Sequence, residues 1–119
     1  MVLVGLIGLE RDEKTAVARQ YYQKFPKITS LDKVIIVDPM LATGGSIDDT
    51  LEVLKGKGII TNISVISVVS APEGLERVIK KYPQLRIFTA AVDEKLNDVK
   101  YIVPGLGDYG DRYFGTDIR

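Results

Sequence analysis

The sequence predicts an α/β protein with a parallel sheet. Apolar runs typical of strands alternate along the chain with patterns typical of single helices. Because a strand, a helix and a second strand in succession form a right-handed crossover, this alternation indicates parallel strands. Ligands of such sheets bind at the carboxyl ends of the strands, so residues that directly follow a strand are candidates for a binding site.

The first expected strand covers residues 2–9, which are almost wholly apolar and include β-branched side chains. We expect this strand to be buried within a sheet. Residues 10–14 form a charged turn. The polar, aromatic stretch at 16–22 fits either an extended arm or a short helix, because the strand and helix periods compete there. Pro26 ends the stretch.

The chain is organised around residues 34–46. The four consecutive apolar residues Val34–Val37 predict a strand buried on both faces, in the middle of a parallel sheet. Asp38 ends the strand, and the small residues 43–46 follow it. Strand, acid, small-residue loop and helix start are therefore consecutive, which places free N–H groups where an anion can bind.

The helix after this loop is expected to run from Ser46 to about Lys57, with Gly58 as its C-terminal residue. Ser46 has the side chain of an N-cap, and Asp49 occupies the acidic position of a capping box three residues later. The apolar stripe that follows would face the sheet.

The next strand is expected at 63–69, followed by a helix that begins at Ala71–Pro72 and stops at Tyr82–Pro83. A further strand is expected at 86–92. From about Asp93 the chain has little periodicity and many turn-forming residues. The side chains that this second helix turns inward are expected to be Leu75, Val78 and Ile79.

Composition excludes several classes of function. With 119 residues, the chain is long enough for one domain. Its 16 basic and 16 acidic residues balance, so neither nucleic acid nor an anionic membrane is indicated as a partner. Cys and His are absent, which excludes disulfides, thiolate or zinc sites and His-based catalytic pairs. No apolar run reaches the length of a membrane span and no signal peptide is recognisable, so we expect a soluble, cytoplasmic protein.

The loop at 38–46 lacks both the Walker A pattern and the dinucleotide-binding glycine pattern. It can be an anion site, because Gly brings backbone N–H groups close to a ligand. It can also be an ordinary tight turn between a strand and a helix, for which paired Gly and a Ser cap suffice.

Two other stretches have equally plain alternatives. By composition alone, the glycine-rich stretch 101–116 is a surface loop with solvated acids. Arg11 follows the first strand and lies among acidic residues. An Arg in such a cluster usually forms a solvated ion pair with a nearby acid. A guanidinium is also suited to bidentate contact with phosphate.

Resemblance to a known family favours the functional alternatives. Residues 37–46, Val-Asp-Pro-Met-Leu-Ala-Thr-Gly-Gly-Ser, resemble the phosphoribosyl-diphosphate (PRPP) loop of the type I phosphoribosyltransferases. The Asp-Pro-Met form resembles the uracil phosphoribosyltransferases, whereas most other type I relatives carry a second acid in place of Pro39. Residues 101–116 resemble the uracil-binding signature of the same family nearly residue for residue. The resemblance implies a Rossmann-like parallel sheet and one partial domain over 1–119, without the family's N-terminal elements.

The resemblance also implies roles for individual residues. In the PRPP loop, Asp38 would bind the ribose hydroxyls and the residues that follow would hold the 5-phosphate. Arg11 would contact the diphosphate, and Asp108 would lie near the uracil nitrogen that becomes glycosylated. These two are the expected catalytic residues, and both also count among the PRPP contacts. The remaining PRPP-binding residues would be Pro39, Met40, Leu41, Ala42, Thr43, Gly44, Gly45 and Ser46, and the other uracil-binding residues would be Ile102, Gly107 and Tyr109.

The implied reaction converts uracil and PRPP into uridine monophosphate (UMP) and diphosphate, a step of pyrimidine salvage. Because a lone carboxylate is a weak metal site, Mg²⁺ would arrive with the diphosphate of PRPP and no protein metal site is expected. The resemblance implies a homo-oligomer, a dimer or tetramer, and leaves open whether GTP activates it. Two alternatives remain at this point: an inactive, truncated remnant, and a non-catalytic regulatory module that binds a ligand or RNA. The balanced charge disfavours RNA.

Overall fold

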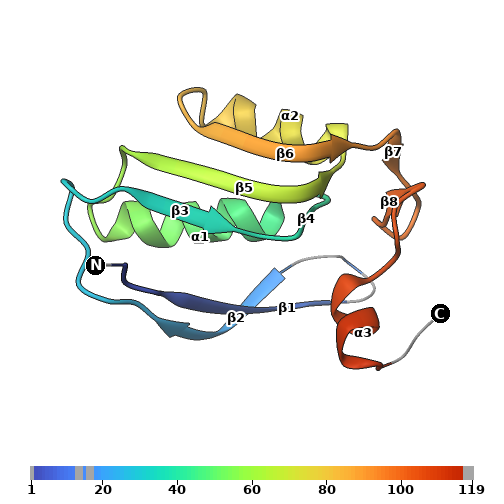
Figure 1. The fold of residues 1–119 in the computed structure, drawn as a ribbon, viewed down its shortest axis with the longest axis horizontal. Coiled ribbons are helices and arrows are strands. Elements are labelled where there is room, and N and C mark those ends of the chain that lie inside the picture. Colours follow the sequence, from blue (N-terminus) through green and yellow to red (C-terminus); the bar gives the residue numbers. More distant parts are fainter. Residues whose placement is uncertain (1, 13–14, 16–17, 117–119) are drawn as a thin grey trace.

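One parallel sheet forms the centre of the computed structural model, which describes residues 2–12, 15 and 18–116 (Figure 1). Its strands are β3 (Val34–Val37), β4 (Met40–Leu41), β5 (Ile63–Ser70) and β6 (Arg86–Val92). β5 lies in the middle, with β3 and β4 paired along one edge and β6 along the other, all of them parallel to β5. The predicted α/β class with a Rossmann-like parallel sheet is therefore confirmed.

Two helices, α1 (Gly45–Gly56) and α2 (Pro72–Lys81), pack on the same face of this sheet (Figure 1). The predicted start of α2 is confirmed, with Pro72 as its first residue. The prediction that Ile79 faces inward is wrong, because its side chain is exposed. The core between the helices and the sheet is formed by Leu41, Ile47, Leu51, Val65 and Val78.

The opposite face of the sheet is apolar and exposed. Val37 is 74% exposed and Ile35 is 51% exposed, so the prediction that this strand is buried on both faces is wrong. The physical reason is that α1 and α2 cover a single face, and alternate residues of each strand point away from them. The same face carries Ile66, Val68 and Phe88.

The strands β1 (Leu6–Arg11) and β2 (Ala18–Lys24) form an antiparallel hairpin. Within the described chain they pair only with each other, so the predicted buried strand at 2–9 is wrong: it begins later and is largely exposed. The open choice for 16–22 resolves as a strand over its described part. Backbone pairing with β1 supplies the hydrogen bonds that a helix would otherwise provide.

The chain ends in three short elements, β7 (Lys95–Leu96), β8 (Ile102–Val103) and α3 (Tyr109–Phe114). β7 and β8 pair as an antiparallel hairpin, and the peptide bond between Val103 and Pro104 is cis. The surface-loop interpretation of 101–116 missed α3. Among the described residues, no helix is both long and apolar enough to cross a membrane.

Candidate active site

A bend after β3 separates the two strands that pair with the same edge of β5. The amide of Asp38 still donates to the carbonyl of Ile66, at 3.1 Å. Next, the carbonyl of Pro39 accepts from the amides of Val68 and Val69, at 3.1 and 3.2 Å. β4 then resumes parallel pairing. Because Pro has no N–H to place in a ladder, it suits this irregular position, and the bend turns Asp38 out of the regular sheet at its carboxyl edge.

The turn from β4 into α1 is built on glycine. Gly44 has a φ of 82° and is the N-cap of α1, so the prediction of Ser46 as N-cap is wrong. A Cβ on Gly44 would also lie 2.8 Å from Cγ2 of Val78, so the turn needs glycine for its shape and for its packing. The amide of Gly45 donates to the hydroxyl of Thr43 at 3.2 Å. The amides of the first helical turn have no partner within the helix, as an anion site requires.

The loop encloses little space of its own. A hollow of about 10 Å³ is lined by Asp38, Met40, Leu41, Ala42, Gly44, Ser46 and Ile47. This volume holds about one water-sized group. The loop is therefore a shallow turn, and most of any ligand bound to it would lie outside the hollow, over the carboxyl ends of the strands.

An ion cluster joins α1 to α2 beside this turn. Asp48 accepts from Lys81 at 2.7 Å, from the Tyr82 hydroxyl at 3.0 Å and from Arg77 at 3.2 Å. Partial burial by itself would raise the pKa of Asp48, but the hydrogen bonds and the two cations outweigh it and lower this pKa. Burial and hydrogen bonds to Glu52 and Asp48 raise the pKa of Tyr82. Arg77 and Lys81 offset the Asp48 charge, so the α1 N-terminus stays favourable for an anion.

The segment 93–107 is fastened to the same edge of the sheet by Asp93. The Asp93 amide donates to the carbonyl of Ser70, the last residue of β5, at 2.9 Å. Its carboxylate accepts from the amide of Gly105 at 3.0 Å. In Figure 1 the carboxyl ends of β4, β5 and β6 all point to the side where β7, β8 and α3 lie. The segment and the loop therefore share one edge of the sheet.

Within this segment, the predicted uracil-binding residues differ in exposure. Ile102 is buried, with 1% of its surface exposed, and pairs with Leu96 across the β7–β8 hairpin. Gly107 has a φ of 80°. Asp108 is exposed and caps α3, with its carboxylate accepting from the amide of Asp111 at 2.9 Å. Tyr109 is partly exposed and stacks on Tyr113, which lies one turn further along α3.

Arg11 is the last residue of β1, and its side chain lies outside what the structure describes. Within residues 2–12, 15 and 18–116, no group of three or more Asp, Glu, His or Cys side chains is placed to hold a metal ion. A lone carboxylate such as Asp38 is a weak Mg²⁺ site, because Mg²⁺ usually keeps several waters and shares oxygen atoms of its substrate.

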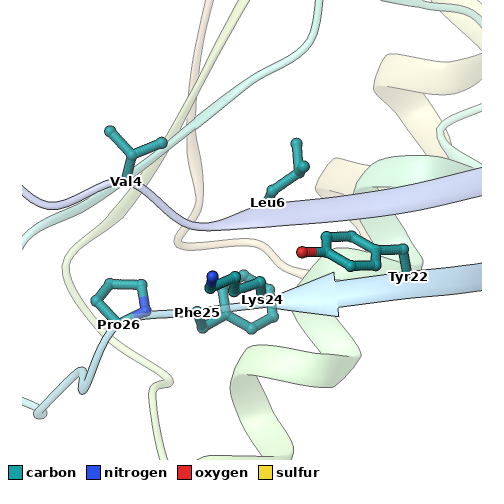
Figure 2. Close-up of a pocket in the computed structure, with 6 residues that line it drawn as sticks. All are labelled: Val4, Leu6, Tyr22, Lys24, Phe25 and Pro26. Carbon is teal, nitrogen blue, oxygen red and sulfur yellow. The ribbon is translucent and has the colours of Figure 1, made fainter.

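A larger cavity, of about 290 Å³, lies on the β1–β2 hairpin and contains none of the predicted site residues (Figure 2). Its lining is mainly apolar, with polar groups from Tyr22 and Lys24. Such a surface offers few groups for orienting a polar substrate. It is lined by Val4, Leu6, Tyr22, Lys24, Phe25 and Pro26.

The parallel sheet, the bend after β3 and the glycine turn before α1 agree with the type I phosphoribosyltransferase fold. The family model described as uracil phosphoribosyltransferase matches residues 1–116. The chain belongs to the uracil phosphoribosyltransferase family.

Similar proteins agree with this assignment. Uracil phosphoribosyltransferases from Dictyoglomus turgidum and Dictyoglomus thermophilum are 53% and 52% identical to the chain over 113 residues, which cover 95% of this chain and 54% of each relative. The solved structure of the AQ2163 protein from Aquifex aeolicus is 38% identical with a TM-score of 0.84, covering 97% of this chain and 54% of that one. The chain therefore spans about half the length of the curated relatives it matches.

Sequence reasoning missed two features of the site. One is the ion cluster on Asp48, whose spacing to Arg77 and Lys81 carries no sequence signal, because the contact depends on how the two helices cross. The other is the first turn of α2, at Glu73 and Gly74, which contacts both candidate binding segments. The glycine in the first turn of a helix was the signal that could have found it, since glycine there lowers helix propensity.

Proposed function

We propose that this chain carries the site at which a uracil phosphoribosyltransferase transfers the phosphoribosyl group of PRPP to uracil, giving UMP and diphosphate. One observation supports this most strongly. The end of β5 is linked to both candidate segments. The Ser70 carbonyl accepts from the amide of Asp93, whose carboxylate accepts from the amide of Gly105 in the uracil-binding segment. The amide of the next residue, Ala71, donates to the carbonyl of Leu41 at 2.9 Å. The phosphate loop (residues 38–46) and the uracil-binding segment (residues 101–116) therefore lie on either side of one strand end. This arrangement suits a reaction between a substrate that carries a phosphate and a base.

In the proposed complex, the amides of residues 42–46 hold the 5-phosphate and Asp38 accepts from the ribose hydroxyls. Backbone groups of Ile102 and Gly107 pair with the amide-like edge of uracil. Uracil presents acceptor, donor and acceptor groups there, which backbone N–H and C=O groups match and cytosine does not. Tyr109 is the remaining residue of the uracil-binding segment that is proposed to contact uracil.

The reaction breaks the bond between C1 of the ribose and diphosphate while N1 of uracil bonds to C1. Diphosphate leaves with the bonding electrons, and the proton of N1 passes to Asp108. The chain supplies position and charge placement in place of a nucleophile. Arg11 contacts the departing diphosphate, and Mg²⁺ enters as part of the Mg–PRPP substrate. The proposal includes a homo-oligomer, as the family resemblance implies.

The first test replaces Asp108 with Asn in the 119-residue chain. We expect turnover to fall by about 10²–10⁴-fold, because a positioned general base contributes that much. PRPP affinity should fall much less than turnover, since the loop holds the phosphate and Asp108 is one of many PRPP contacts. Turnover is measured by UMP formation and PRPP affinity by calorimetry.

The matched control is Asp98→Asn, the same change at an exposed acid in the turn between β7 and β8. This variant should keep wild-type turnover. Wild-type turnover in Asp108→Asn would remove the assigned role of Asp108. A chain that binds neither PRPP nor uracil would contradict the proposed function and favour a remnant.

A further inference from the structure

The first turn of α2 lies between the two proposed binding segments. It begins directly after β5, and the amide of its N-cap residue, Ala71, donates to the carbonyl of Leu41 in the phosphate loop. The next three residues are Pro72, Glu73 and Gly74. Pro72 has a backbone conformation that suits the start of a helix. Glu73 and Gly74 contact different parts of the fold.

Gly74 packs backbone against backbone on the phosphate loop. It is buried, and a Cβ added to it would overlap the carbonyl oxygen of Ala42 and lie 2.7 Å from Cδ2 of Leu41. Its own carbonyl oxygen lies 3.0 Å from the place where a Cβ on Gly44 would be. Neither neighbour can move cheaply, because one is loop backbone and the other a core side chain. The path of the loop from Leu41 to Gly44 is therefore fixed by the absence of a side chain at Gly74.

Glu73 contacts the β7–β8 hairpin, whose second strand lies in the uracil-binding segment 101–116. Its carboxylate accepts a hydrogen bond from the amide of Leu96 in β7. Leu96 pairs directly with Ile102, whose backbone is proposed to bind uracil. An acid in the first turn of a helix is favourable through the helix dipole alone, but here the carboxylate is bonded to a different element of the fold.

We propose that Glu73 and Gly74 are positioning residues that set the phosphate loop and the uracil-binding segment relative to each other. Gly74 lets the loop approach α2, and Glu73 holds the β7–β8 hairpin against the same helical turn. This inference rests on the proposed function, in which the two segments bind the two halves of the reacting pair. Two substrates held about 3 Å apart at their reacting atoms depend on such fixed spacing, since a small misplacement costs much of the rate.

The test compares Glu73→Ala, Glu73→Gln and Gly74→Ala with a control, Glu76→Ala, at an exposed position on the same helix. Amide hydrogen exchange is first measured without ligand. We expect Glu73→Ala to speed exchange over residues 94–103 and Gly74→Ala to speed it over residues 41–46. Glu73→Gln should restore slow exchange, because the amide oxygen accepts the same hydrogen bond.

Affinities are then measured by calorimetry, with PRPP alone and with uracil added to chain saturated with ribose 5-phosphate, which cannot react. Glu73→Ala should weaken uracil binding about three- to tenfold, because the hairpin loses an exposed hydrogen bond that orders it for binding, with little change for PRPP. Gly74→Ala should weaken PRPP binding at least about tenfold, because the loop must shift to avoid the overlap. The midpoints of thermal unfolding are also measured, to distinguish a selective loss of affinity for one ligand from a general loss of folded protein.

Two results would overturn the inference: exchange in both segments as in the control, or equal weakening of both ligands in Glu73→Ala and Gly74→Ala alike. A wild-type chain that binds neither ligand would instead overturn the proposed function, and the exchange rates would still decide whether Glu73 and Gly74 fix the two segments.

Discussion

The phosphate loop and the uracil-binding segment are held in place by different forces. The loop continues a core strand: Leu41 is 1% exposed, and Gly44 and Gly74 bring loop and helix into backbone contact. The uracil-binding segment, together with residues 93–100 that lead into it, buries few side chains. It depends on hydrogen bonds that backbone N–H groups donate to two carboxylates and to the amide oxygen of Asn97. Packing gives the loop a single shape, whereas the segment takes its shape from a few polar contacts.

Leu41→Ala should have the largest effect of the changes that test this comparison. Removing a fully buried Leu leaves a cavity beneath the loop and should lower the free energy of unfolding by about 2–5 kcal/mol. Urea denaturation measures the loss, and PRPP affinity should fall with it. A loss below about 0.5 kcal/mol would place the loop outside the core, since surface substitutions behave that way.

Asp93→Ala should have a smaller effect on stability and a more local effect on shape. It removes the bond to the Gly105 amide, 3.0 Å long, and should cost about 1–2 kcal/mol, because the bond is exposed and water replaces part of it. NMR amide shifts should change over residues 102–107 and remain as in the wild type over 41–46. Shifts spread equally over both regions would mean that the two do not depend on separate forces.

Asn97→Ala tests the same segment at its tip. The Asn97 side chain accepts from the amides of Val99 and Tyr101, each at 3.0 Å. Because the site is partly exposed, water replaces much of each bond, and we expect a loss of about 0.5–1.5 kcal/mol. A matched change at exposed Asp98 should cost less. Equal losses at the two positions, measured by urea denaturation, would show that the Asn97 bonds add nothing.

Asp48→Asn should give the smallest effect, seen mainly in pH dependence. The pKa of Asp48 is lowered in the folded chain from its ordinary value of 3.8. Its contribution to stability is therefore complete above that value and is lost as the pH falls through the folded-state pKa. The stability of the variant should therefore fall less steeply as the pH is lowered. Thermal unfolding at several pH values measures this dependence. An acid limb identical to that of the wild type would contradict the role of the cluster.

The sequence predicts the order of the elements better than their surroundings. Strand 86–92 and the start of α2 agree with the structure, because an apolar run and an Ala-Pro boundary are local signals. The burial of Val37 does not agree, because an apolar strand carries no sign of which face the helices cover. The sequence predicts Ser46 as the N-cap of α1, whereas the structure has Gly44 there. The turn needs a residue with positive φ, and this requirement outweighs the preference for a hydroxyl side chain at the N-cap.

The candidate site divides in the same way. The loop at 38–46 and the segment with Ile102 and Asp108 could be recognised from contiguous residue patterns, and the structure places both at one edge of the sheet. Glu73 could not be recognised, because its partner Leu96 is far away in the sequence and the contact exists only after folding. Helix α3 could not be predicted, because its six residues are too few to show a helical period.

The most direct test of the shared site is an NMR titration of the labelled chain with PRPP and then, in a ribose 5-phosphate-saturated sample, with uracil. We predict that PRPP moves the amide signals of Ala42–Ser46 and that uracil moves those of Ile102–Gly107. Changes that gather instead around the cavity of Val4 and Phe25, or that are absent from both segments, would contradict the site.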